Sequence, residues 1–224
     1  MTEKEFWTPV KVESYLKSLS DKSLILPDNI YCTNNFKWNE VLCLSRRRIT
    51  MPNIDILRNL YYVTSVLQVY RDIIRTPFWI TSGWRTADEQ NNLVRMYASG
   101  KLKNKPSKTS LHLEGLALDF VVSGSSQRLA QNIIDKTLIG EAEFGFDYTH
   151  IGLTTFSKAY LQRQGVYNPD IYRKLCINKC LLTDNIRSGL IKRLNPKNWQ
   201  SLQSSFSISE NNLLFENRYN LLNL

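Results

Sequence analysis

SLHLEGLALDF, residues 110–120, is the most informative segment of the sequence, because it predicts a strand that carries a carboxylate. Two valines follow it, so Asp119 is a carboxylate inside an apolar run. Because side chains alternate between the two faces of a strand, Ala117, Asp119 and Val121 should share one face. Burying a carboxylate there is costly unless a partner compensates its charge. We therefore expect a strand over 116–122 with a partner such as a metal ion beside Asp119.

The two histidines of the chain lie where such a metal ion would need its other ligands. His112 comes seven residues before Asp119, and Gly115 between them allows a sharp turn. His150 arrives from a separate segment, 31 residues after Asp119. Two imidazoles and one carboxylate can hold zinc and leave the fourth position open for water. Asp147, three residues before His150, is a candidate general base close to that water.

Length and composition favour one main globular domain with extensions. The 224 residues can bury a sizeable core, and 42% hydrophobic with 22% charged residues is typical of soluble proteins. Since no run of 18 apolar residues occurs, we expect no transmembrane segment. The start, MTEKEFWTPV, has no apolar core of a signal peptide. We therefore expect synthesis in the cytoplasm, and work outside the cell would need another exit route.

Charge and cysteine content indicate partners and redox state. The net charge of +9 favours solubility, or attraction to a polyanion such as nucleic acid, a membrane surface or an anionic cell wall. No aromatic and basic recognition motif occurs, so we expect no specific nucleic-acid partner. The absence of an export signal argues for reduced thiols. Cys176 and Cys180 are interpreted as packing residues rather than as a second metal site.

Apolar spacing and capping signals predict the order of the elements. Apolar residues recur at helical spacing from Asn53 to Arg75, and Thr86 with Glu89 forms a capping box that starts a second helix. The remaining expectations are a helical lead over 1–30, a strand over 78–81, a helix end near 99–100, a basic loop over 101–109, a helix over 126–136, and a turn plus strand over 144–153. From about residue 155 the helical spacing of apolar residues is weak, and we interpret this part of the chain as an accessory extension.

Three motifs in one order resemble a known family. They are ITSGWRT at 80–86, Ser-x-His-x-x-Gly-x-Ala-x-Asp at 110–119 and Asp-x-x-His at 147–150. Together they resemble the zinc D-alanyl-D-alanine carboxypeptidase family. This family includes vancomycin-resistance D,D-dipeptidases and phage L-alanyl-D-glutamate endolysins, and it shares its fold with the hedgehog signalling domain. FKWNE at 36–40 is similar to the entry of that domain, so the resemblance covers about 34–154.

The resemblance implies an α+β fold, a small antiparallel sheet flanked by helices, and one zinc ion held by His112, Asp119 and His150. It implies that Asp147 is the catalytic base and that Arg85 contacts a carbonyl or carboxylate of the substrate. Ser110 matches a serine that supports the first ligand or touches substrate. The guanidinium of Arg85 suits contact with a carbonyl or carboxylate because it is always charged and donates in a fixed, planar fork.

The expected division is a helical lead over 1–33, a zinc peptidase domain over 34–154 and a basic extension over 155–224. The expected activity is hydrolysis of peptide bonds in peptidoglycan stem peptides by a monomeric carboxypeptidase or endopeptidase, such as a phage lysin released through holin-made lesions.

Two departures from the family pattern bear on the expected substrate and on the catalytic base. Relatives often have a short Gly-Gly loop between the arginine and the first histidine, whereas this span holds a longer helix and the basic loop over 101–109 here. Close relatives also carry an aromatic where Asp147 stands. The alternative is a non-catalytic binding module of the same fold that zinc stabilises.

Overall fold

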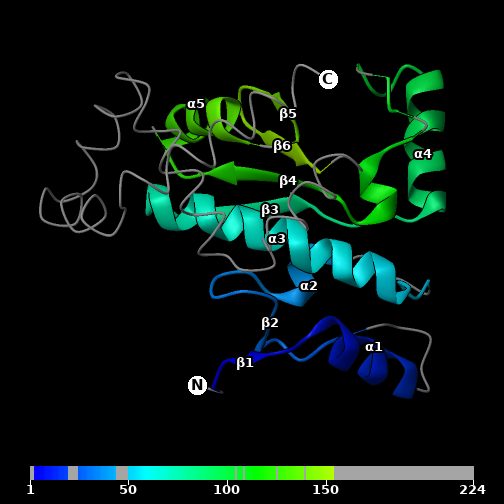
Figure 1. Ribbon diagram of the computed structural model, residues 1–224. Helices are drawn as coiled ribbons and strands as arrows, with labels where there is room; N and C mark the ends of the chain where they lie inside the picture. The colour runs from blue at the N-terminus through cyan, green and yellow to red at the C-terminus, as the bar shows by residue number, and fades with distance from the viewer. Residues whose placement is uncertain are drawn as a thin grey trace, which may run out of the picture.

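The computed structural model describes residues 3–19, 25–43, 50–103, 105–107, 109–124, 126–138 and 140–153 (Figure 1). The extension over 155–224, with Cys176 and Cys180, lies outside the described residues. The helices are α1 (Pro9–Ser18), α2 (Trp38–Val41), α3 (Ile54–Ile74), α4 (Ala87–Ala98), the 3-10 helix η2 (Leu111–Glu114) and α5 (Ser126–Thr137). The strands are β1 (Glu5–Phe6), β2 (Ile30–Tyr31), β3 (Phe78–Ser82), β4 (Ala117–Val122), β5 (Glu141–Phe144) and β6 (Thr149–Gly152).

A four-stranded antiparallel sheet in the order β3-β4-β6-β5 is the centre of this α+β fold. The strand expected around Asp119 is confirmed as β4, which pairs with both β3 and β6. Leu118, Phe120 and Val122 are buried in the hydrophobic core. The intervening residues, Asp119 among them, point to the other face because side chains alternate along a strand. The alternation therefore turns the carboxylate away from the core.

The long helix expected from the apolar spacing is confirmed as α3. It begins after Asn53, whose side chain accepts a hydrogen bond of 2.9 Å from the backbone N–H of Ile56. It ends where Arg75 adopts a left-handed conformation with φ 55°, and Pro77 follows. In Figure 1 the helix runs between the sheet and the N-terminal elements, and it contacts α1, α5 and β4. Each fully buried Leu or Val on it contributes roughly 1.5–3 kcal/mol to folding.

The N-terminal lead is less helical than expected. Its helix is only α1, which begins at Pro9 after the N-cap Thr8. On either side of α1, β1 and β2 form a two-stranded parallel sheet with Glu5 opposite Ile30. Two-residue strands that pair over such a separation leave no periodic pattern to detect. Buried residues of the lead, such as Val12 and Leu16, belong to the same hydrophobic core as α3 and β4.

The second capped helix is confirmed as α4. Thr86 accepts from the backbone N–H of Glu89, and the Glu89 carboxylate accepts from the backbone N–H of Thr86 in return. The helix ends at Ala98, two residues before Gly100, whose φ is 74°. Of the helices in the described ranges, none combines the length and the apolar content that crossing a lipid bilayer requires.

The segment that leads from β3 to α4 is anchored by α2. The backbone N–H of Trp84 donates to the Val41 carbonyl at 2.9 Å, and the N–H of Gly83 donates to Cys43 Sγ at 3.0 Å. A Cβ atom placed on Gly83 would lie 2.0 Å from the Val41 carbonyl oxygen. Only glycine therefore fits this approach of two backbones.

We predict that Gly83→Ala lowers the free energy of unfolding by about 1–3 kcal/mol, because an added methyl group in a tight contact forces the backbone apart. Urea denaturation of both proteins measures the difference. Gly100→Ala is the matched control, since its Cβ would meet nothing within 4 Å and its cost is that of a left-handed alanine alone. Equal midpoints for Gly83→Ala and wild type would contradict the close approach.

Candidate metal centre

The strand register places the candidate ligands in one row across the sheet. Asp119 on β4 pairs directly with His150 on β6. On the other side of Asp119 stands Ser82 of β3, and beyond His150 stands Glu143 of β5. Directly opposed residues in an antiparallel pair point to the same face, with Cβ atoms roughly 4.5–5.5 Å apart. Ser82, Asp119, His150 and Glu143 therefore project from one face of the sheet.

The third ligand, His112, reaches the row from η2 rather than from the sheet. Gly115 ends η2 with φ 70°, and a Cβ there would lie 2.8 Å from the Ile56 carbonyl oxygen. This confirms the sharp turn expected at the glycine, and it folds His112 back over β4. The backbone N–H of Arg85 donates to the His112 carbonyl at 3.0 Å, which fixes η2 against the start of α4.

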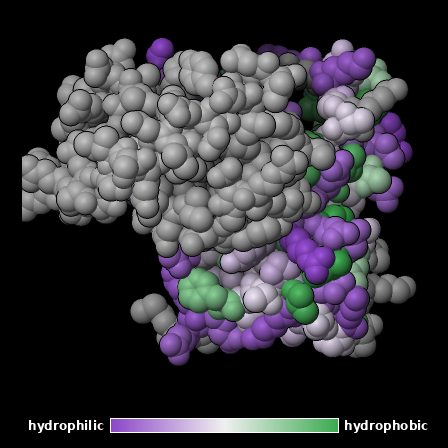
Figure 2. All heavy atoms as spheres, in the orientation of Figure 1, coloured by the Kyte–Doolittle hydropathy of each residue, from purple (hydrophilic) through white to green (hydrophobic). Residues whose placement is uncertain are grey.

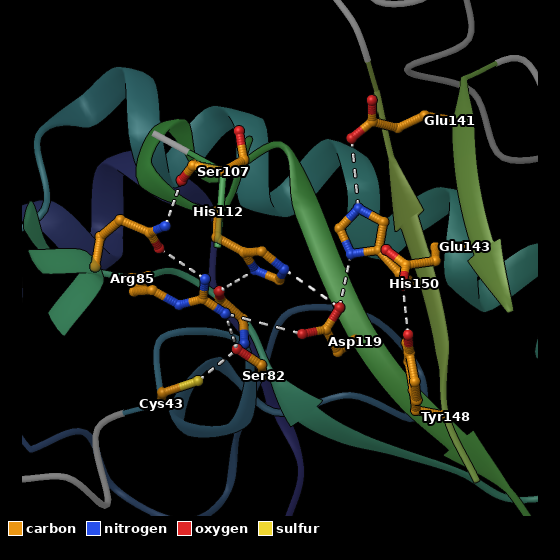
Figure 3. A network of polar contacts seen from close by, with 12 residues as sticks. Cys43, Ser82, Arg85, Ser107, His112, Asp119, Glu141, Glu143, Tyr148 and His150 are labelled. Atoms are coloured by element: carbon orange, nitrogen blue, oxygen red, sulfur yellow. Dashed lines mark hydrogen bonds and ion pairs between the residues drawn. The ribbon is translucent and has the colours of Figure 1, made fainter. Parts of the chain in front are cut away.

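The orientation of the His112 ring leaves one nitrogen for a metal ion. Nδ1 lies 2.7 Å from the Gly83 carbonyl oxygen, and Nε2 lies 3.3 Å from Asp119 Oδ1 (Figure 3). A carbonyl only accepts, so Nδ1 carries a proton and donates to Gly83, and Nε2 is the ring nitrogen that faces Asp119 and that a metal ion would take. A donor bond from the remote ring nitrogen is the usual way in which proteins orient a metal-binding histidine.

His112, Asp119 and His150 come together as a cluster that could hold a metal ion, with one ligand atom from each residue within 4.8 Å of the others. His150 Nδ1 lies 2.7 Å from Asp119 Oδ1. His112 is buried, whereas the side chains of Asp119 and His150 keep 23% and 17% of their surface exposed. A metal ion here would therefore have protein ligands on one side and an accessible side open to water or substrate.

Electrostatics keep the carboxylate of the cluster ionised. Burial alone would raise the pKa of Asp119, but the hydrogen bonds from His112 and His150 and their positive charge outweigh burial and hold that pKa well below its usual range. Burial alone would lower the pKa of His150, but the bond to Asp119 and its negative charge, followed by Glu141, raise that pKa above its ordinary value. Asp119 is thus an anionic ligand at neutral pH.

Arg85 stands beside the cluster and is held by neutral groups. Its Nη1 donates to Gln90 Oε1 at 2.8 Å, and its Nη2 donates to Ser82 Oγ at 3.2 Å. Its distance to Asp119 Oδ2 is 3.9 Å, which is longer than a hydrogen bond. Gln90 in turn donates to the Ser107 carbonyl in the basic loop at 2.5 Å. The guanidinium therefore faces the cluster and is tied to it by an ion pair with Asp119 and by bonds to two uncharged acceptors.

Two glutamates of the edge strand β5 complete the surroundings. Glu141 Oε1 lies 3.4 Å from His150 Nε2, the nitrogen that points away from Asp119 (Figure 3). Such a carboxylate can accept a proton from the outer nitrogen of a ligating imidazole. Glu143 accepts a hydrogen bond of 2.5 Å from the Tyr148 hydroxyl, and this bond raises the pKa of Tyr148 to about 12.

Sequence reasoning did not predict the strand that carries Glu141 and Glu143. β5 reads EAEF and alternates glutamates with apolar residues, but it is only four residues long and all four are exposed, so no buried face marks it as a strand. Ser82 and Gln90 were also missed as partners of Arg85. No sequence signal marks these partners, because the burial of Gln90, the one buried residue of α4, is visible only in the structure.

Two predicted site residues lie outside this network. Asp147 is exposed and lies in the turn between β5 and β6, and the described polar contacts of the three ligands run to Gly83, Arg85 and Glu141 instead. Ser110 is the half-buried N-cap of η2, and its carbonyl accepts from the Leu113 N–H at 3.0 Å. Ser110 therefore supports the turn that carries His112.

We predict that the chain binds one equivalent of a divalent metal ion, and that Asp119→Ala abolishes this binding. The loss should exceed the roughly 10–100-fold drop that follows removal of an outer partner of a metal ligand. With free metal at 100 times the dissociation constant, wild type should also gain about 2.7 kcal/mol of stability over its chelated form. Metal analysis and calorimetric melting measure both effects.

Asp88→Asn is the control for that experiment, because Asp88 is an exposed carboxylate in the first turn of α4, outside the metal cluster. Uptake that is unchanged in Asp119→Ala, or that falls equally in Asp88→Asn, would show that the metal binds elsewhere.

Comparisons with known proteins return no match: no family model fits the chain, and neither curated proteins nor solved structures give a significant similarity.

Proposed function

We propose that the chain is a zinc-dependent peptidase of the D-alanyl-D-alanine carboxypeptidase type, with a hedgehog/DD-peptidase-like fold. Its proposed substrates are the stem peptides of peptidoglycan, and its action is that of a carboxypeptidase or an endopeptidase such as a phage lysin. The observation that carries the proposal is the meeting of His112, Asp119 and His150 within 4.8 Å. These are the three residues that the family motifs single out as ligands.

The donor set favours zinc among the divalent ions. Imidazole nitrogens together with one carboxylate are typical ligands of catalytic zinc, whereas calcium and magnesium prefer oxygen ligands throughout. Zinc in a three-ligand site acts as a Lewis acid on a carbonyl oxygen and lowers the pKa of water in its open position to about 7. The exposed side of Asp119 and His150 supports such an open position.

The proposed reaction is hydrolysis of an amide. The oxygen of water forms a bond to the carbonyl carbon, the C–N bond breaks, and the water proton passes to the leaving amine. Asp147 is proposed as the base that accepts this proton and then delivers it. Its turn lies next to His150, and exposed residues of a turn can approach a substrate when it closes the site.

Arg85 is proposed to stabilise the negative charge that develops on the carbonyl oxygen, or to bind a substrate carboxylate. Its guanidinium is fixed by Gln90 and Ser82 and lies 3.9 Å from Asp119, so its charge is positioned beside the metal cluster where the carbonyl of a substrate would lie. A fixed donor that needs no reorganisation stabilises a transition state better than a mobile one.

We predict that Arg85→Lys lowers kcat/KM on purified muropeptides by on the order of 10²–10³, the typical cost of losing one donor to a developing oxyanion. Lysine keeps the charge but lacks the planar fork. Metal content should stay at the wild-type level. Arg58→Lys, on the exposed side of α3, is the matched control. Unchanged kcat/KM in Arg85→Lys would remove Arg85 from the mechanism.

We predict that Asp147→Asn lowers the rate of muropeptide hydrolysis by on the order of 10²–10⁴, the usual contribution of a positioned acid or base. The amide keeps the shape of the side chain but loses the basic oxygen. Folding and zinc content should be unaffected, as melting temperature and metal analysis would show. Mass spectrometry of the products identifies the bond that is cleaved.

Two comparisons sharpen this experiment. Asp55→Asn removes an exposed carboxylate at the start of α3 and should leave the rate unchanged. Glu143→Gln tests the carboxylate that the strand register puts beside His150. A rate that falls in Glu143→Gln and not in Asp147→Asn would contradict Asp147 as the base. Zinc-loaded wild type without hydrolysis of any stem peptide would favour the binding module.

A further inference from the structure

A cavity lies on the opposite side of α3 from the metal cluster. It has a volume of about 400 Å³ and is lined by residues 6–8 next to β1, by residues 32–34 after β2 and by one side of α3. In Figure 1, β1 and β2 lie below α3 and the four-stranded sheet lies above it. Cavities of roughly 300–1,000 Å³ are typical of sites for small ligands.

The floor of this cavity is a polar stripe on α3. Tyr61, Ser65, Gln68 and Asp72 line it and follow one another at intervals of four, three and four residues, so they share one face of the helix. Most other buried positions of α3 are apolar. The face that α3 turns toward β1 and β2 is therefore not built as an ordinary hydrophobic contact.

The floor is rigid because Gln68 is fixed on both sides of its amide. Its Oε1 accepts from the Thr33 hydroxyl and from the Asn35 N–H, each at 3.0 Å. Its Nε2 donates to Asn35 Oδ1 at 2.8 Å and to Asp72 Oδ1 at 2.7 Å. A polar group held in this way keeps its position in the absence of ligand, which reduces the entropy lost on binding.

The charges around the cavity disfavour ionic ligands. The Lys11 ammonium already lies 4.5 Å from the centre of the Trp7 ring, so a cationic ligand would meet a like charge at that aromatic wall. Asp72 in the floor, which accepts from Gln68, and the Glu5 carboxylate, 3.7 Å from Lys11, add groups of the opposite sign, so the cavity carries no excess of either charge for an ionic ligand. The occupant that fits best is therefore neutral.

The lining of the cavity as a whole combines aromatic rings with hydrogen-bonding groups. Phe6 is 57% exposed and Tyr61 is half-buried, while the Thr33 hydroxyl and the exposed Asn34 amide lie at the same cavity. A sugar ring presents C–H groups that pack on an aromatic face and hydroxyl groups at its rim that bond to amides and hydroxyls. On the face of the molecule that Figure 2 draws, the described residues show hydrophobic side chains as small areas among hydrophilic ones.

We propose that this cavity binds a neutral saccharide, and specifically an N-acetylated hexose of a glycan strand. The saccharide class follows from the walls and charges of the cavity. The N-acetyl group rests on the proposed function, because the polymer whose stem peptides are cleaved carries such sugars. The site would hold the chain on the glycan while the metal centre acts on a peptide.

The test is a calorimetric titration of the full-length chain with tetra-N-acetylchitotetraose, which is uncharged and contains no stem peptide. Saturable binding is expected, with cellotetraose, which lacks the acetamido groups, binding more weakly. Phe6→Ala and Asn34→Ala should each weaken binding about three- to tenfold, as expected for one aromatic or hydrogen-bonding contact. Both residues are exposed, so the variants should fold, and melting temperatures check this.

Phe146→Ala is the matched control, because Phe146 is a fully exposed phenylalanine in the turn between β5 and β6. Asp119→Ala should bind the saccharide normally, so failure of the metal centre and failure of this site are distinguishable. The absence of saturable binding would overturn the proposal. So would binding that Phe6→Ala and Asn34→Ala leave unchanged, or binding of choline or inorganic phosphate in place of the saccharide. Equal affinity for cellotetraose would overturn the N-acetyl assignment.

Discussion

The pairing of β4 with β6 is the constraint on which the candidate metal centre depends. It sets Asp119 opposite His150, and every other polar contact of the cluster is arranged around these two side chains. A shift of one residue in this register would turn His150 toward the core and Asp119 would lose its partner. Leu118 and Ile151, which are also opposed and are fully buried, hold the register from the other face.

Around this pair, both charged and uncharged partners hold the ionised side chains of the site. The carboxylate of Asp119 has two imidazoles within hydrogen-bond reach, so it stays ionised in a half-buried position. Arg85 donates to a hydroxyl and to an amide oxygen, and it also forms an ion pair with Asp119 at 3.9 Å, which is longer than a hydrogen bond. The site thus holds a negative and a positive side chain next to each other.

Sequence reasoning predicted the elements whose signals are local. The capping box at Thr86, the helical spacing of α3 and the apolar run around Asp119 each depend on neighbours within a few residues, and the structure has all three. The grouping of both histidines with Asp119 in a cluster that could hold a metal ion was also predicted, since the chain has only two histidines. β1, β2 and β5 were missed because short or fully exposed strands are defined by partners distant in sequence. The contacts of Gln90 with Arg85 and Ser107 depend on how the loop over 101–109 packs against α4. The spacing of residues in the sequence does not predict such packing.

The cluster also has a consequence for how the protein is made. Its ligands come from η2, β4 and β6, and the last of them, His150, is separated from Asp119 by α5 and β5. During synthesis a chain emerges from its N-terminus and folds in that order. The core of α3 with the N-terminal elements can therefore assemble while the ribosome still holds β6. Until residue 150 has emerged, only two of the three candidate ligands exist, so a metal ion held by this cluster would bind only after β6 has been synthesised.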